Sequence, residues 1–277
     1  MQGFASPCVL RRMSHLIATK FESIGARVDV HSTVQRRWGQ PKSPLRIDIA
    51  RDRRGEFFDI GRRPDEVQLR VLDTRPHARH LLLFAQLERG NQRFLCGFDE
   101  REWFVAGIPD RARVSTVAAA MEALRPDEVS QELLRKGVKK RRRNRRRNAA
   151  FVRQGEWFFI PAPDLRPNEQ WLLRREPLQR GGGKPHIVDE LYRSGGETVY
   201  VSRLYPNGLV ERDYRAWLSR YNGPRVAWQV MRRDAAVYVR GRVRHPDHKT
   251  IRLRDWHQVQ MNLEWQSTAM RNVAFLD

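Results

Sequence analysis

Three histidines and an aspartate near residue 250 are the residues of this chain best suited to hold a metal ion. His245, Asp247 and His248 lie within four residues, and His257 follows nine residues later. Imidazole nitrogens bind divalent transition metals, and a carboxylate can add an oxygen ligand. A metal or a general base here predicts a nuclease or another phosphoryl-processing hydrolase. The alternative is an ordinary Pro-Asp turn whose histidines contact only solvent or phosphate.

A run of positive charge in the middle of the chain is suited to phosphate binding. Eight of the nine residues from 139 to 147 are basic, namely Lys139, Lys140, Arg141, Arg142, Arg143, Arg145, Arg146 and Arg147. Like charges at this density cannot be buried together, so the run needs solvent or a polyanion. Guanidinium groups donate paired hydrogen bonds to phosphate and release its counterions. Nucleic-acid contact is the favoured interpretation, and a solvated linker or a nuclear import signal is the alternative.

A predicted β-hairpin with the histidines at its tip carries more arginines. Facing residues of a hairpin share one side of the sheet, so the turn length decides which side chains gather. A three-residue turn at 246–248 pairs Val243 with Ile251, Arg242 with Arg252 and Arg240 with Arg254. One face is then apolar and the other is basic, with Tyr238, Arg240, Arg242, Arg244, Arg252 and Arg254. Opposed like charges destabilise a sheet, so this face predicts an anionic ligand. Pairing with acidic residues elsewhere in the fold is the alternative.

A glycine loop forms a further candidate for phosphate contact. Gly182, Gly183 and Lys184 precede a helix predicted over 185–193. Backbone amides of a glycine loop at a helix N-terminus can hold an anion, and the lysine adds charge. The spacing of a P-loop is absent, so a flexible connector is the competing interpretation.

Short strands and a few helices must position these residues. Apolar spacing predicts helices over 9–24, 114–124, 126–136, 185–193 and 211–221, and a meander of four or five strands over 55–109. More strands are predicted over 198–204, 225–231, 236–243 and onward to 261. Since helices and strands follow no regular βαβ period, the predicted fold class is α+β with largely antiparallel β-meanders.

The length of 277 residues allows one large or two modest domains. We expect an N-terminal α+β domain over 1–125 and a C-terminal α+β domain over 151–277 that carries the arginine-faced hairpin. A helix and the basic run, over 126–150, are expected to connect these two halves.

Charge and composition narrow the function classes. The formal net charge is +21, and removing the eight charges of the run still leaves +13. A basic surplus of this size predicts nucleic acid as the partner. No apolar stretch approaches a membrane span and no signal peptide is evident, so we expect a cytoplasmic protein without membrane contact. Two cysteines are too few for a disulfide framework or a cysteine-built zinc site.

The sequence therefore predicts a nucleic-acid-binding protein, with RNA slightly favoured over DNA because the best-defined basic surface is β. Such a protein would work with protein subunits of a ribonucleoprotein or a nucleic-acid-processing complex. The alternative is a metal-dependent nuclease or other hydrolase that uses His245, Asp247, His248 and His257. No cofactor is implied by the sequence apart from a divalent metal at these histidines.

Overall fold

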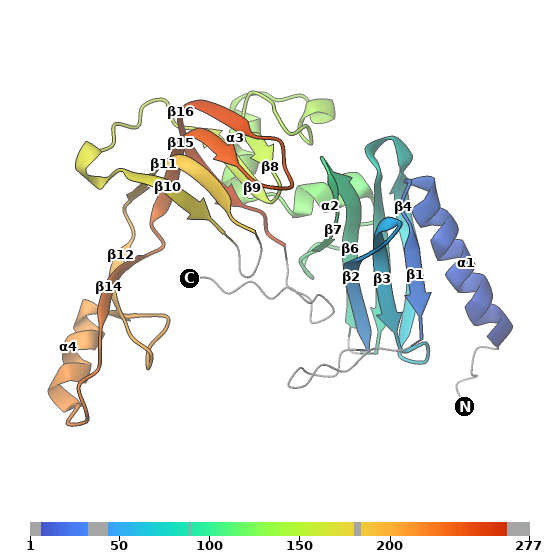
Figure 1. The fold of residues 1–277 in the computed structure, drawn as a ribbon, viewed down its shortest axis with the longest axis horizontal. Coiled ribbons are helices and arrows are strands. Elements are labelled where there is room, and N and C mark those ends of the chain that lie inside the picture. Colours follow the sequence, from blue (N-terminus) through green and yellow to red (C-terminus); the bar gives the residue numbers. More distant parts are fainter. Residues whose placement is uncertain (1–6, 33–43, 89, 180–183, 265–277) are drawn as a thin grey trace.

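The computed structural model describes residues 7–32, 44–88, 90–179 and 184–264 (Figure 1). These residues form a mixed α+β fold in which most strands are antiparallel, which confirms the predicted fold class. Four of the five predicted helices are present: α1 (Pro7–Ser23), α2 (Val117–Ala123), α3 (Asp127–Arg135) and α4 (Glu211–Arg220). None of the helices within these ranges is long and apolar enough to cross a membrane.

The first half of the chain contains two sheets that lie against each other, with α1 along one side (Figure 1). The smaller sheet has the order β1-β3-β2, built from β1 (Val28–His31), β3 (Gly55–Arg62) and β2 (Leu45–Asp52). Strand β1 runs parallel to β3, whereas β2 is antiparallel to it. The rings of Phe21 in α1 and Phe58 in β3 are 4.8 Å apart in the shared core.

The larger sheet of this half is the predicted meander. Its four antiparallel strands follow chain order: β4 (Val67–Arg75), β5 (His80–Leu87), β6 (Gly90–Asp99) and β7 (Glu102–Gly107). Both faces of β5 are buried, because Leu81 and Leu83 face the α1 core while Leu82 packs beneath α2. This double burial explains why β5 is a continuous apolar run instead of an alternating one.

A six-stranded antiparallel sheet organises the second half of the chain. Its order is β10-β11-β15-β16-β9-β8. The strands are β8 (Val152–Gln154), β9 (Trp157–Pro161), β10 (Leu173–Leu178), β11 (His186–Ser194), β15 (Ala236–Arg244) and β16 (Ile251–Met261). Trp157 and Phe159 of β9 join the core on one face of this sheet, while Phe158 packs with α3 on the other. Because successive side chains of a strand point to opposite faces of the sheet, β9 contributes to the cores on both faces.

Three short 3₁₀ turns, η1 (Pro76–Ala78), η2 (Lys140–Arg142) and η3 (Glu169–Trp171), complete the main body. An arm is inserted between β11 and β15. It consists of β12 (Glu197–Val201), β13 (Leu209–Val210), α4 and β14 (Gln229–Arg233), and it extends away from the sheet (Figure 1, orange). Helix α4 has no buried residue, so stacked tyrosines and tryptophans hold the arm together.

The helix predicted over 185–193 is wrong, because this segment is strand β11, paired with β10 and β15. A register shift between Val188 and Glu190 places a bulge in the strand. Val188 and Leu191 therefore both reach the same core although they are three residues apart. A bulged strand reproduces the apolar spacing of a helix over this short distance, which is why the pattern misled the prediction.

The predicted hairpin register is confirmed near the turn. Val243 pairs with Ile251, and Arg242 pairs with Arg252. The expected pair of Arg240 with Arg254 is absent, because the register shifts between Val239 and Gly241. Gly241 has φ +93°, and a Cβ there would lie 2.7 Å from the Asp189 side chain, so the bulge requires glycine at this position.

Candidate nucleic-acid surface and histidine cluster

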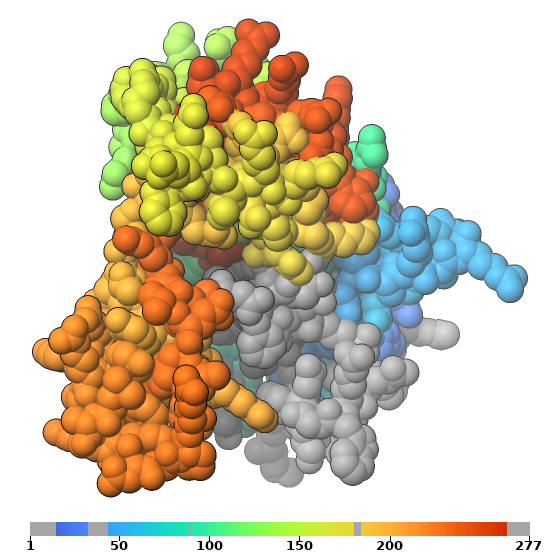
Figure 2. Space-filling model, turned by 60° about the vertical axis from the view of Figure 1, so that its left-hand side comes forward, coloured from blue at the N-terminus to red at the C-terminus, as the bar shows by residue number. Residues whose placement is uncertain are grey.

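An open pocket of about 770 Å³ lies over strands β10, β11, β15 and β16. Figure 2 shows the yellow, gold and red segments that supply these strands gathered in the upper part of the molecule. The polar lining comprises five arginines and two acidic residues: Arg174, Arg175, Arg240, Arg252, Arg254, Asp189 and Glu190. We call this surface the arginine pocket. Its lining carries five positive and two negative charges, an excess of three.

The acidic residues of the pocket hold part of the predicted arginine face. Glu190 accepts a hydrogen bond from Arg240 Nε at 2.6 Å. Asp189 pairs with Arg242 Nε at 3.1 Å and Arg244 Nη2 at 2.9 Å. The Arg242 backbone N–H, followed by these guanidinium groups, holds the pKa of Asp189 below its ordinary value. Internal pairing, the alternative to ligand binding, thus accounts for three arginines of the hairpin.

The remaining arginines of the pocket are exposed and have no acidic partner among the described residues. They are Arg174 and Arg175 in β10 and Arg252 and Arg254 in β16. Arg242 and Arg252 face each other across the hairpin, so two like charges share one side of the sheet. The Arg240 guanidinium lies 4.8 Å from the Trp256 ring centre. Tyr238 is half-buried beside Tyr192 and Gln258 and is not part of the pocket lining.

The basic run at 139–147 is folded onto the protein between α3 and β8. Arg143 Nε donates to the Val138 carbonyl at 2.9 Å, and Arg146 pairs with Asp99 and with Glu100, the latter at 2.8 Å. The other six basic side chains are exposed: Lys139, Lys140, Arg141, Arg142, Arg145 and Arg147. The backbone is therefore held in place while six cationic side chains face solvent.

The predicted phosphate loop falls largely outside the described part of the chain, since Gly182 and Gly183 belong to residues 180–183. Lys184 is described, and its Nζ bonds both carboxylate oxygens of Asp247, at 2.9 and 2.7 Å. A strand follows this lysine, so the expected anion site at a helix N-terminus has no helix to form it.

Three histidines from distant parts of the chain meet at the tip of the hairpin, and we call them the histidine cluster. His186 begins β11, while His245 and His248 lie in the turn between β15 and β16. Their rings are stacked, with centres 4.2 Å apart for His186 and His245, 4.6 Å for His245 and His248, and 5.5 Å for His186 and His248. One potential ligand atom from each residue lies within 4.8 Å of the other two.

The histidine cluster is shielded from solvent, unlike histidines on a protein surface. His186 is 1% exposed, and neither of its ring nitrogens has a hydrogen-bond partner in the structure. Burial first, and then the neighbouring His245 and His248, lower the pKa of His186 to about 3. Burial also lowers the pKa of His248. Both imidazoles are therefore neutral at pH 7, with lone pairs available to a ligand.

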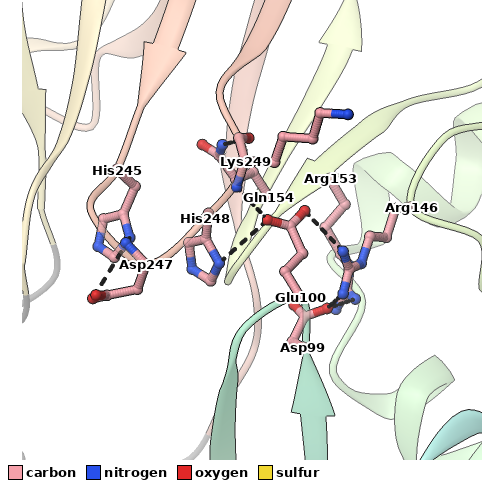
Figure 3. Close-up of polar contacts among 9 residues, drawn as sticks. All are labelled: Asp99, Glu100, Arg146, Arg153, Gln154, His245, Asp247, His248 and Lys249. Carbon is pink, nitrogen blue, oxygen red and sulfur yellow. Dashed lines mark hydrogen bonds and ion pairs between the residues drawn. The ribbon is translucent and has the colours of Figure 1, made fainter.

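Carboxylates surround the cluster where the two halves of the chain meet. Glu100 of the β6–β7 turn lies between His248 and Arg146 (Figure 3). Its Oε2 is 3.7 Å from His248 Nδ1 and accepts a hydrogen bond from the Lys249 backbone N–H at 2.6 Å. Burial, together with Asp247, which hydrogen-bonds and repels the Glu102 carboxyl, raises the pKa of Glu102 to about 7.

Sequence spacing predicted two members of this cluster and missed the third. His257 does not join His245 and His248, because it pairs with Val239 and Pro161 inside the sheet and its Nδ1 contacts the Asp255 carbonyl at 2.8 Å. His186 takes that place. The pairing of β11 with β15 could have revealed it, since Ile187 faces Arg244, one residue from the turn. Because residues 185–193 were predicted to form a helix, this strand pairing was not considered.

No protein-family model, curated protein or solved structure matches this chain.

Proposed function

We propose that this protein binds nucleic acid through the arginine pocket and the basic run. The observation that carries the proposal is the set of four exposed arginines in the pocket, Arg174, Arg175, Arg252 and Arg254, that lack an acidic partner in the described chain. Cations gathered in one concave surface raise the local concentration of a polyanion. The paired donors of guanidinium match the oxygens of phosphate groups.

Binding of this kind is mainly phosphate neutralisation. The pocket lies on β-strands and the basic run lies on a loop, so neither presents a helix that could enter a DNA major groove. A single strand, whose phosphates can follow an irregular surface, suits such sites better than a rigid duplex. We therefore favour RNA over DNA, with little preference for sequence.

In this proposal the segment 126–150 is a basic connector between two halves, and both halves approach the same ligand. The protein would work in the cytoplasm, as a subunit of a ribonucleoprotein or a nucleic-acid-processing complex. The exposed residues of the arm, which include Leu204, Leu218 and Val230, offer protein subunits a place to contact it.

The test is binding of the stripped protein to single-stranded RNA, duplex RNA and duplex DNA over a series of salt concentrations. Arg252→Ala/Arg254→Ala is compared with Arg53→Ala/Arg54→Ala, which removes the same charge from the exposed β2–β3 turn. We expect the pocket variant alone to lower the slope of log affinity against log salt by about 1.4 for single strands. Equal slopes for the two variants, or binding no tighter than to heparin, would reject the proposal.

Of the four residues predicted for a metal-dependent nuclease, His245, Asp247 and His248 lie close together, and His257 lies in the sheet away from them. Incubating the same RNA with protein and Zn²⁺ or Mn²⁺ distinguishes the two functions. Cleavage that ends when His248 is changed to alanine supports the nuclease, whereas intact RNA that is still retained supports binding alone.

A further inference from the structure

A buried imidazole without a partner has an energetic cost that calls for a ligand. A neutral imidazole carries one N–H donor and one lone pair, and leaving such a group unpaired in the interior costs about 1–3 kcal/mol. His186 leaves both nitrogens unpaired. Its neighbours are two more imidazoles: Nδ1 of His248 is also unpaired, whereas Nδ1 of His245 accepts only the Asp247 backbone N–H. A metal ion is the ligand that accepts three such lone pairs at once.

We propose that His186, His245 and His248 bind one divalent transition-metal ion of the zinc type. Three imidazoles on a tetrahedral ion leave a fourth position for water. This proposal assigns a site outside the arginine pocket, and it does not depend on nucleic-acid binding.

The distances require a small adjustment of the rings. Two nitrogens on a tetrahedral zinc ion lie about 3.4 Å apart, given Zn–N bonds of about 2.0–2.1 Å. The potential ligand atoms of the cluster lie within 4.8 Å of one another, so each pair must close by at most about 1.4 Å. Rotation about the Cα–Cβ and Cβ–Cγ bonds of His245 and His248 can supply such a movement, because both residues lie in a turn.

Gly155 keeps one side of the cluster open. This residue begins the turn between β8 and β9 and has φ +56°. A Cβ here would lie 2.9 Å from His248 Nε2 and 3.5 Å from His186 Nε2. The same two nitrogens therefore face a common space that any larger residue would fill.

Neighbouring oxygens can orient two of the ligands. Metal-bound histidines usually donate their second ring N–H to a carboxylate or a carbonyl. Glu100 lies 3.7 Å from His248 Nδ1, which leaves Nε2 of that ring for the metal. The Lys184 carbonyl lies 3.2 Å from His245 Nε2, which leaves Nδ1. The metal would replace the Asp247 backbone N–H that now donates to His245 Nδ1.

Carboxylates nearby also balance the charge of a divalent ion. Asp247 Oδ2 is 3.9 Å from His245 Nδ1, and Glu100 is held in place by Arg146 and by the Lys249 N–H. A dication buried without negative charge around it would be costly. Here two carboxylates already lie within 4 Å of the ligand rings.

The experiment measures Zn²⁺ and Co²⁺ binding to the purified, chelator-treated full chain. We expect one ion per chain, visible d–d absorption with Co²⁺, and three imidazole ligands from X-ray absorption at the zinc edge. His245→Ala and His248→Ala should each weaken binding about 100-fold or more. His257→Ala is the matched control, since this buried histidine lies outside the cluster, and it should bind as the wild type does.

His186→Gln tests the ligand that the sequence did not predict. Because this side chain is fully buried, the variant is used only if its circular dichroism matches that of the wild type, and the absorption edge counts ligands without any substitution. Absence of stoichiometric metal in the wild type, or fewer than three imidazoles at the edge, would overturn the proposal. So would metal binding that His257→Ala weakens as much as His248→Ala does.

Discussion

The arginine pocket lies over β10, β11, β15 and β16, whereas the histidine cluster lies at the start of β11 and in the turn between β15 and β16. The two regions differ in their access to water. Four arginines of the pocket have no acidic partner in the described chain, and because they are exposed, water solvates them. The histidine cluster is shielded, and His186 is 1% exposed with two unpaired nitrogens. An unpaired cation on the surface costs little, whereas an unpaired polar group in the interior costs about 1–3 kcal/mol.

This difference decides how each region can be interpreted. The surface arginines indicate the class of ligand through their charge and their gathering in one pocket, because solvent can satisfy each of them singly. The histidine cluster indicates a ligand through its unpaired nitrogens on His186 and His248, and charge says little there because these two rings are neutral. Charge tests therefore suit the pocket, and metal occupancy tests suit the cluster.

Charge reversal in the pocket should have the largest effect. Arg252→Glu/Arg254→Glu changes the pocket by four charge units and should weaken RNA binding about 100- to 1000-fold, or about 3–4 kcal/mol. The sheet should remain folded, because position 252 faces Arg242 and opposite charges there are favourable. Fluorescence anisotropy with labelled single-stranded RNA measures the affinity.

Arg53→Glu/Arg54→Glu is the control for this reversal, because it changes the net charge identically at the β2–β3 turn, far from the pocket strands in the sequence. Zinc binding by both variants should equal that of the wild type. A similar loss of RNA affinity in both would mean that the pocket has no special role.

Zinc should affect stability and leave RNA affinity unchanged. At a free Zn²⁺ concentration of 100 times its dissociation constant, the free energy of unfolding should rise by about 2.7 kcal/mol. For a chain of this size that corresponds to about 5–10 °C in Tm. Differential scanning fluorimetry with and without chelator measures the shift. RNA affinity that changes more than about twofold on chelation would show that the two regions are coupled.

The fold was largely predictable from local patterns, and the failures have local causes. Four helices and the meander followed from apolar spacing and turn residues, because each depends on contacts close in sequence. The segment 185–193 failed because a bulge gave a strand the spacing of a helix. Strand β3 was expected in the meander but belongs to the smaller sheet, because it pairs with β1 and β2, which precede it in the chain.

The candidate site was predictable only where it is local. The turn register that gathers Arg242 and Arg252 followed from alternation alone, and it is confirmed. His186 could not be placed beside His245, since their approach depends on pairing between strands that are separated by the whole arm. Whether an arginine is paired, as Arg244 is with Asp189, also depends on such long-range contacts.

Removal of an acidic residue from the pocket should strengthen binding. Asp189→Asn releases Arg242 and Arg244 from their carboxylate and adds one unit of positive charge to the pocket. We expect RNA affinity to rise about fivefold, or about 1 kcal/mol. Glu197→Gln is the control, because it removes a charge paired with Arg233 in the arm. If Asp189→Asn weakens RNA binding while the fold persists, these ion pairs position the pocket and do not compete with its ligand.

The smallest effect concerns the carboxyl groups beside the histidine cluster. Glu102 faces Asp247, Lys184 and Glu56, and burial raises its pKa from 4.5 to about 7. The folded chain thus holds a proton that the unfolded chain releases above about pH 4.5. The stability from this group is complete below that pH and is lost as the pH rises through 7. Because Glu102 is partly exposed, we expect a change of only about 0.5 kcal/mol.

Glu102→Gln should abolish this loss, since an amide can donate to Asp247 at every pH. Urea unfolding of the metal-free protein at pH 5 and pH 8 measures the difference between wild type and variant. Glu128→Gln, on the exposed side of α3, removes the same charge and should leave the wild-type pH dependence in place. If the free energy of unfolding of Glu102→Gln falls between pH 5 and pH 8 as much as that of the wild type, another carboxyl group holds the proton.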